Sequence, residues 1–186
     1  MTAIREPRQG IPVDAPLQSR PGARGATELR KVAEQFDVLT NPRYHPPGDG
    51  RTWCNIFAGD VTRAMGCEVP HWVRADGTPA LPGAPGAHEL NANAVCDWLR
   101  SPVAVAPAGH GWSLVGAGDA NAAAARGECV VVSWQNPVAS RPGHVAILLP
   151  PVDGQQRIAQ AGASNYFDVP LARGFGSLPV KFYRHP

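Results

Sequence analysis

The clearest hydrophobic pattern in the chain lies within residues 52–66. Apolar residues recur there at helical spacing: Ile56, Phe57, Val61, Ala64 and Met65. Thr52 is suited to cap this helix and Gly66 to end it. The segment 46–50, rich in proline and glycine, predicts a loop ahead of it. The pattern therefore predicts a loop that turns into a helix close to Cys54.

Three further helical patterns precede the last third of the chain. Residues 26–39 place apolar side chains on one helical face, and Asn41-Pro42 marks the end of that helix. Asn91 is suited to cap a helix that closes at Ser101-Pro102. Asp119 begins an alanine-rich helix that Gly127 stops.

From residue 129 onward the pattern is that of β-structure. Apolar and β-branched runs predict strands at residues 129–134, 144–149, 157–161 and 180–183, with a shorter one at 113–115. Residues 150–154 predict a turn. Helices followed by a meandering sheet predict an α+β fold, with the helices on one side of an antiparallel sheet.

The remaining part of the chain, residues 1–26, shows neither period. Its four prolines and scattered polar residues predict a flexible N-terminal tail, either mobile or loosely docked on the domain. Residues 27–186 are then expected to form a single domain, long enough to enclose a core. The 20 glycines and 20 prolines of the chain favour short elements joined by many loops.

Charge and hydropathy exclude several classes of function. The formal net charge is +2 with no run of Lys or Arg, so neither a nucleic-acid partner nor a membrane-surface patch is expected. The apolar runs are of strand length, which predicts no membrane span. The N-terminus lacks the pattern of a secretory signal peptide, so any work outside the cytoplasm requires another export route.

Four cysteines, Cys54, Cys67, Cys96 and Cys129, are widely spaced and form no C-x-x-C pair, so no metal site is expected. A cysteine at a helix start lies beside unpaired N–H groups and the positive end of the helix dipole, which favour the nucleophilic thiolate. The alternative is that Cys54 is an ordinary buried residue. If Cys54 is reactive, one disulfide among the other three is possible in an oxidising compartment, and the spacing does not choose the pair.

A thiol nucleophile needs a base and a group that orients the base. Among six histidines, His144 stands out because it opens a strand directly after Gly143; the alternative is a structural role. If strands 144–149 and 157–162 form a hairpin, His144 lies opposite Gly162, with Gln160 as a diagonal neighbour on the same face. Gln160 can then orient the imidazole, unless it faces solvent, and Asn165 competes for that role.

Together these pieces resemble the NlpC/P60 and CHAP superfamily of papain-like cysteine peptidases and amidases. The matching segments are residues 52–57, 143–147 and 158–162, with Tyr44 upstream. The resemblance implies Cys54 as nucleophile, His144 as base and Gln160 as the orienting residue, without a cofactor. Two departures mark a divergent branch: Asn-Ile-Phe follows the cysteine where the family has Asp-Cys-Ser-Gly, and Gln stands at the third position.

The resemblance also implies residues that bind substrate or the oxyanion. Tyr44 matches the family's upstream tyrosine, and Trp53, Asn55 and Asn165 are further candidates for these roles. Trp53, Trp72 and Trp112 can line a peptide groove, or belong to the core.

The implied function is hydrolysis of an amide bond in the peptide part of bacterial peptidoglycan. A compact catalytic domain of this kind is similar to toxin amidases delivered by bacterial secretion systems, type VI among them, and to phage lysins. The expected partners are the stem peptide as substrate and an immunity or inhibitor protein, with the enzyme itself a monomer. The same fold acting on another acyl substrate, such as a protein amide or a lipid ester, and a catalytically inactive binding module remain the alternatives.

Overall fold

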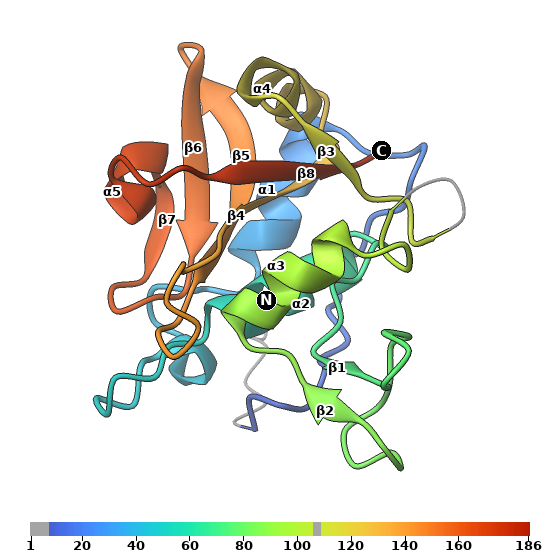
Figure 1. The fold of residues 1–186 in the computed structure, drawn as a ribbon. Coiled ribbons are helices and arrows are strands. Elements are labelled where there is room, and N and C mark those ends of the chain that lie inside the picture. Colours follow the sequence, from blue (N-terminus) through green and yellow to red (C-terminus); the bar gives the residue numbers. More distant parts are fainter. Residues whose placement is uncertain (1–7, 106–108) are drawn as a thin grey trace.

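The computed structural model describes residues 8–105 and 109–186, and these form a six-stranded antiparallel sheet with helices on both of its faces (Figure 1). The strand order is β3-β8-β4-β5-β6-β7. The strands are β3 (Ser113–Val115), β4 (Cys129–Trp134), β5 (His144–Val152), β6 (Gln155–Gln160), β7 (Tyr166–Pro170) and β8 (Lys181–His185). The mixed α+β class follows the predicted order of elements.

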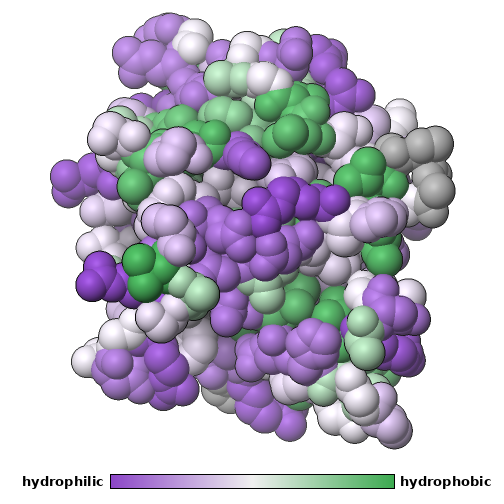
Figure 2. Space-filling view, viewed as in Figure 1, coloured by the Kyte–Doolittle hydropathy of each residue, from purple (hydrophilic) through white to green (hydrophobic). Residues whose placement is uncertain are grey.

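The helices are α1 (Ala26–Glu34), α2 (Cys54–Ala64), α3 (Ala92–Arg100), α4 (Ala117–Ala125) and α5 (Leu171–Phe175). A short 3-10 helix, η1 (Pro42–Tyr44), precedes α2, and a small hairpin of β1 (Trp72–Val73) and β2 (His88–Glu89) lies between α2 and α3. The hydrophilic outer side of α3 crosses the middle of the face seen in Figure 2.

Two hydrophobic cores lie on the two sides of the sheet. On one side, Val131, Ile147 and Ala159 pack with the apolar faces of α1, α2 and α3. On the other side, Leu148 and Ile158 pack with α4 and Phe175 of α5. The prediction of helices on one side only is therefore wrong. The nearly continuous apolar run of β4 is the pattern expected when both faces of a strand are covered.

Helix α2 is the central helix, because nine of its eleven residues are buried. It begins at Cys54, one residue after Trp53, so Thr52 does not occupy the predicted cap position. The predicted stop is confirmed: Gly66 follows the helix with φ +69°, the left-handed conformation that glycine adopts most easily. Helix α3 also follows its prediction, since the Asn91 side chain accepts the N–H of Ala94 at 3.0 Å.

Several element boundaries differ from the predicted ones. Helix α1 ends at Glu34 rather than near residue 39, since Asp37 adopts φ +50°. Helix α4 begins at Ala117, ahead of the predicted Asp119. Strand β5 runs through its two prolines to a turn at Asp153-Gly154. Its pairing with β6 is irregular between Leu149 and Val152, which accommodates these prolines because they cannot donate a backbone hydrogen bond. Strand β7 and helix α5 have no predicted counterpart.

The predicted flexible tail is packed against the domain over its described part, residues 8–25. Val13 and Ala15 are buried in the same core as α1 and α2. The backbone N–H of Ser19 donates to the carbonyl of Ala64 at the end of α2, at 2.8 Å. Residues 1–7 lie outside the described ranges. Of the helices in the described ranges, none has the length and apolar character needed to cross a bilayer.

Candidate active site

Cys54 is the first residue of α2, and its thiol lies at a helix end with unpaired backbone donors. The first hydrogen bond of the helix runs from the N–H of Phe57 to the carbonyl of Trp53, at 3.0 Å. Within the described ranges no side chain caps this end. The N–H groups of the first turn therefore have no side-chain partner among the described residues, and the positive end of the helix dipole faces the same side.

His144 is held at the beginning of β5 by a glycine that no larger residue could replace. A Cβ at Gly143 would lie 2.4 Å from the side-chain oxygen of Asn93 and 2.6 Å from the carbonyl of Trp134. His144 itself pairs with Trp134 across the β4–β5 ladder. The Gly-His sequence therefore reflects a close approach between the start of β5, the end of β4 and the first turn of α3.

The thiol of Cys54 and the imidazole of His144 lie close enough for each to shift the pKa of the other. Burial alone would raise the pKa of Cys54. Hydrogen bonding and charge from His144, with smaller contributions from the backbone of Val145 and from Thr52, outweigh burial and hold the pKa of Cys54 below its ordinary value. Burial would lower the pKa of His144, but the Cys54 thiolate and Gln160 raise it overall. The two shifts both favour a thiolate–imidazolium pair.

Gln160, the last residue of β6, contacts the imidazole from the neighbouring strand. Its Oε1 atom lies 2.7 Å from Nε2 of His144, and its Nε2 atom donates to the carbonyl of Ser164 at 3.3 Å. The contact with Ser164 fixes which end of the amide faces the ring. An amide oxygen can only accept, so Nε2 of His144 carries a proton and Nδ1 remains to face the sulfur.

Helix α5 covers the back of this arrangement, and its residues were not predicted from the sequence. The ring of Phe175 lies 4.9 Å from that of His144, centroid to centroid. A Cβ at Gly174 would lie 2.3 Å from Oε1 of Gln160. Gly174 therefore leaves the space that the Gln160 amide fills. The only signal in the sequence is a glycine inside a five-residue helix too short to show a period.

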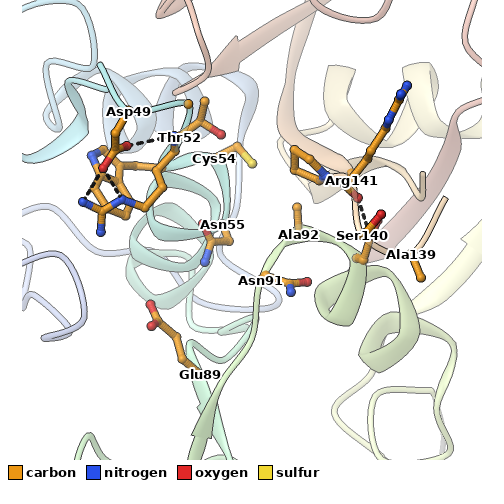
Figure 3. Close-up of a pocket in the computed structure, with 16 residues that line it drawn as sticks. Asp49, Thr52, Cys54, Asn55, Glu89, Asn91, Ala92, Ala139, Ser140 and Arg141 are labelled. Carbon is orange, nitrogen blue, oxygen red and sulfur yellow. Dashed lines mark hydrogen bonds and ion pairs between the residues drawn. The ribbon is translucent and has the colours of Figure 1, made fainter. Parts of the chain in front are cut away.

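A cleft of about 540 Å³ opens in front of Cys54 (Figure 3). Three segments line it: residues 49–55, the stretch from Glu89 to Asn93, and the loop 139–143 that leads into His144. In Figure 3 the sulfur of Cys54 points from the start of α2 into the gap between α2 and the segment of Ala139, Ser140 and Arg141. The sulfur is little exposed, at 2% for the residue, but the cleft gives a ligand a route to it.

Two of the four candidate binding residues line this cleft. Trp53 forms part of its wall, with its Nε1 donating to the carbonyl of His45 at 2.8 Å and the guanidinium of Arg51 5.5 Å from its ring. Asn55 also lines the cleft, and its amide donates to the carbonyl of Leu90 at 2.8 Å. Backbone carbonyls therefore hold both side chains in place in the cleft that Cys54 also lines.

Tyr44 and Asn165 lie outside the cleft. The Tyr44 side chain is fully buried and its hydroxyl donates to Oδ2 of Asp60, at 2.8 Å. The amide of Asn165 donates to the carbonyls of Val38 and Tyr44, at 2.8 and 3.1 Å, so it does not reach His144 as an orienting residue. The oxyanion and binding roles implied for these two residues do not agree with these positions.

Two of the three tryptophans considered for a groove are also elsewhere. Trp112 is completely buried in the core, and Trp72 donates its Nε1–H to the carbonyl of Gly10, at 3.0 Å.

In the described ranges, no group of three or more His, Cys, Asp or Glu side chains is arranged to hold a metal ion. No protein-family model and no curated protein sequence matches the chain.

Proposed function

We propose that the protein is a papain-like cysteine hydrolase that cleaves an amide bond in the peptide part of bacterial cell wall. The contact of Cys54 with His144, and of His144 with Gln160, beside an open cleft carries this proposal. A thiol, an imidazole and an amide in this order form the arrangement expected of a thiol acyl-transfer enzyme.

In the first half of the reaction the Cys54 thiolate attacks the carbonyl carbon of the substrate amide. A carbon–sulfur bond forms, and negative charge develops on the carbonyl oxygen. The uncapped N–H groups at the start of α2, with that of Cys54 itself, are suited to stabilise this oxyanion. The imidazolium of His144 then gives its Nδ1 proton to the leaving amine as the carbon–nitrogen bond breaks.

In the second half water hydrolyses the thioester. His144, now neutral, accepts a proton from the water as the water oxygen attacks the acyl carbon. The carbon–sulfur bond breaks, which releases the acid product and restores the thiolate–imidazolium pair. Throughout the cycle Gln160 accepts the Nε2–H of His144 and so keeps Nδ1 turned toward the reacting atoms.

The cleft supports a peptide substrate with charges of both signs. Carboxylates of Asp49 and Glu89 and guanidinium groups of Arg51 and Arg141 all belong to its lining. Asn55, Asn91 and Asn93 add polar groups between them. Stem peptides of peptidoglycan carry both free carboxylates and amines, in agreement with such a lining and with the resemblance to wall amidases.

Digestion of purified peptidoglycan, followed by mass spectrometry of the soluble fragments, tests the proposal. The wild-type protein should release fragments whose masses identify the bond cut, and Cys54→Ala and His144→Ala should each release none while keeping their fold by circular dichroism. Full activity of His144→Ala would exclude it as the base.

Two other results would point to the alternative functions. A rapidly alkylated Cys54 in a protein that leaves the wall intact would favour another acyl substrate. Slow alkylation of all four cysteines would favour an inactive binding module.

A further inference from the structure

A second pair of cysteines, remote from the cleft, lies close together inside the core. Cys67 follows the end of α2, and Cys129 is the first residue of β4. Both belong to the same core cluster, and the Cys67 thiol lies close enough to raise the pKa of Cys129. Both residues are buried, and all four cysteines of the chain, each within the described ranges, are free thiols. Neither Cys67 nor Cys129 lines the cleft, so the proposed reaction uses neither.

An independent set of contacts brings the same two backbone segments together. The guanidinium of Arg24 donates to the carbonyl of Met65, two residues before Cys67. The same guanidinium donates to the carbonyl of His185 at 2.7 Å, and His185 is the β8 partner of Cys129. Arg24 thus connects the end of α2 with the edge of the sheet where Cys129 lies. The approach of the two thiols is part of the packing of these segments.

We propose that Cys67 and Cys129 form a structural disulfide when the protein matures in an oxidising compartment. The oxidant is a small-molecule or protein disulfide, RSSR. The thiolate of one cysteine attacks a sulfur of RSSR, forms a mixed disulfide and expels RS⁻. The thiolate of the second cysteine attacks the protein sulfur of that mixed disulfide and expels the second RS⁻. Two protons and two electrons leave the protein, and RSSR becomes two thiols.

The bond is expected to close while the chain folds. The neighbouring Cys67 thiol and burial both raise the pKa of Cys129 well above its ordinary value, so few thiolates are available in the finished core. During folding the thiols are accessible, and packing of α2 on the sheet then brings them together. The bond would link the C-terminal end of α2, the end remote from Cys54, to the start of β4. It would close a loop of 62 positions (129 − 67 = 62).

The experiment compares the full chain refolded from urea with oxidised and reduced glutathione against the chain refolded with reductant alone. The oxidised wild-type protein should lose about 2 Da, the mass of two hydrogen atoms. Trypsin should then give one cross-linked species that joins the Cys67 peptide, residues 64–74, to the peptide beginning at Gly127. Each of these peptides contains a single cysteine, so the linkage is unambiguous.

Three variants sharpen the assignment. Cys67→Ala and Cys129→Ala should both abolish the mass change, whereas Cys96→Ala, the matched control, should keep it. The oxidised wild-type protein should melt roughly 5 to 10 °C above the reduced form, because a disulfide closing a long loop constrains the unfolded chain.

Four alkylatable thiols in the wild-type protein after oxidative refolding would overturn the proposal. A cross-link that includes Cys54 or Cys96 would do the same. So would a bond between Cys67 and Cys129 that lowers the melting temperature, since the native packing would then not accommodate it. None of these results depends on hydrolytic activity, so the disulfide can fail while the proposed function stands, and the reverse.

Discussion

Nε2 of His144 lies 2.7 Å from Oε1 of Gln160, across the β5–β6 pair. Extended by three residues past the pair of Ile147 and Ala159, the register of these strands would place His144 opposite Gly162, with Gln160 diagonally beside it. Because Gly162 has no side chain, the imidazole and the amide can meet over it; a Cβ there would lie 3.1 Å from Nε2 of Gln160. The hydrogen bond is thus a consequence of strand register.

Replacing Gln160 by Ala should weaken catalysis without abolishing it. His144 remains, so the loss should be smaller than the roughly 10²- to 10⁴-fold effect of removing an acid–base group. Gln160 raises the pKa of His144, so its removal lowers that pKa. The imidazolium is then lost at a lower pH, and the alkaline limb of the kcat/KM profile should move to lower pH.

Asn165→Ala is the matched control for this change. It removes an amide that binds the carbonyls of Val38 and Tyr44, so we expect lower stability but an unchanged pH profile. If Asn165→Ala reduced kcat/KM more than Gln160→Ala, the assignment of Gln160 as the positioning residue would be wrong.

Gly174→Ala should damage the site although Gly174 touches no substrate. The added methyl group would lie 2.3 Å from Oε1 of Gln160 and 2.6 Å from Cδ1 of Ile158, so the amide must move away from His144. We expect kcat/KM to fall about as far as in Gln160→Ala. In the double variant the two losses should not add, because residues in contact act through the same interaction.

Gly118→Ala provides the comparison for Gly174→Ala. Gly118 lies in α4, and no atom comes within 4 Å of the position that a Cβ would take there, so the extra methyl group meets nothing. Activity should be unchanged, and stability should rise by about 0.4 to 1 kcal/mol from the stiffer unfolded chain. A normal kcat/KM in Gly174→Ala would show that α5 does not position the Gln160 amide.

Alkylation by iodoacetamide at pH 7 should modify Cys54 before the other cysteines. His144 outweighs burial and lowers the pKa of Cys54, whereas burial raises the pKa of Cys96 to about 11. Since the thiolate is the reactive form, the Cys96 shift alone should slow its reaction by roughly 10²-fold relative to an ordinary thiol. Peptide mass spectrometry over a time course gives both rates.

His144→Ala tests the cause of the Cys54 reactivity. Without the imidazolium, burial is left to raise the pKa of Cys54, and its alkylation at pH 7 should slow markedly. An unchanged or faster rate would mean that the thiolate does not depend on His144.

Tyr44→Phe should affect stability and leave catalysis intact. The Tyr44 hydroxyl donates to the buried carboxylate of Asp60, which also pairs with Arg43 through Nε at 2.7 Å. Loss of a hydrogen bond to a charged group should reduce the free energy of unfolding by about 1.5 to 3 kcal/mol. The measurement is urea unfolding, with kcat determined on the folded fraction.

Asp60→Ala removes the carboxylate that binds both Tyr44 and Arg43, and so gives the largest loss of stability expected from this network. It leaves the buried guanidinium of Arg43 without its carboxylate partner, which should cost about 3 to 5 kcal/mol. A large fall in kcat for Tyr44→Phe, with stability unchanged, would return Tyr44 to the catalytic role implied by the family resemblance.

Elements with a strong local pattern could be predicted from the sequence. Helix α2 carries apolar residues at helical spacing, and strand β4 carries a nearly continuous apolar run. The β5–β6 register follows from two adjacent runs joined by turn residues. The structure brings together the side chains of Cys54, His144 and Gln160, and their catalytic roles stay predictions. The family resemblance placed Tyr44 near the nucleophile by its position in the sequence. It could not show that the Tyr44 hydroxyl donates its hydrogen bond to Asp60, in the second turn of α2.

Features that depend on distant partners could not be predicted. Strand β7 and helix α5 are short and mix polar with apolar residues, so their formation rests on packing against β6 and the second core. The space at Gly174 has meaning only beside Gln160, 14 positions away (174 − 160 = 14). Burial of Val13 and Ala15 likewise follows from the surface that α1 and α2 offer, because two apolar residues make no period.

The guanidinium of Arg43 joins the start of the described chain to the central helix. Besides Asp60, it donates to the carbonyls of Arg8 and Ile11, at 2.9 and 2.8 Å. A shortened protein that begins at α1, the boundary that the hydrophobic pattern suggests, would open a hole over a buried cation. Water entering there would reach Asp60 in the middle of α2. The segment before α1 therefore shields the helix that carries Cys54 from solvent.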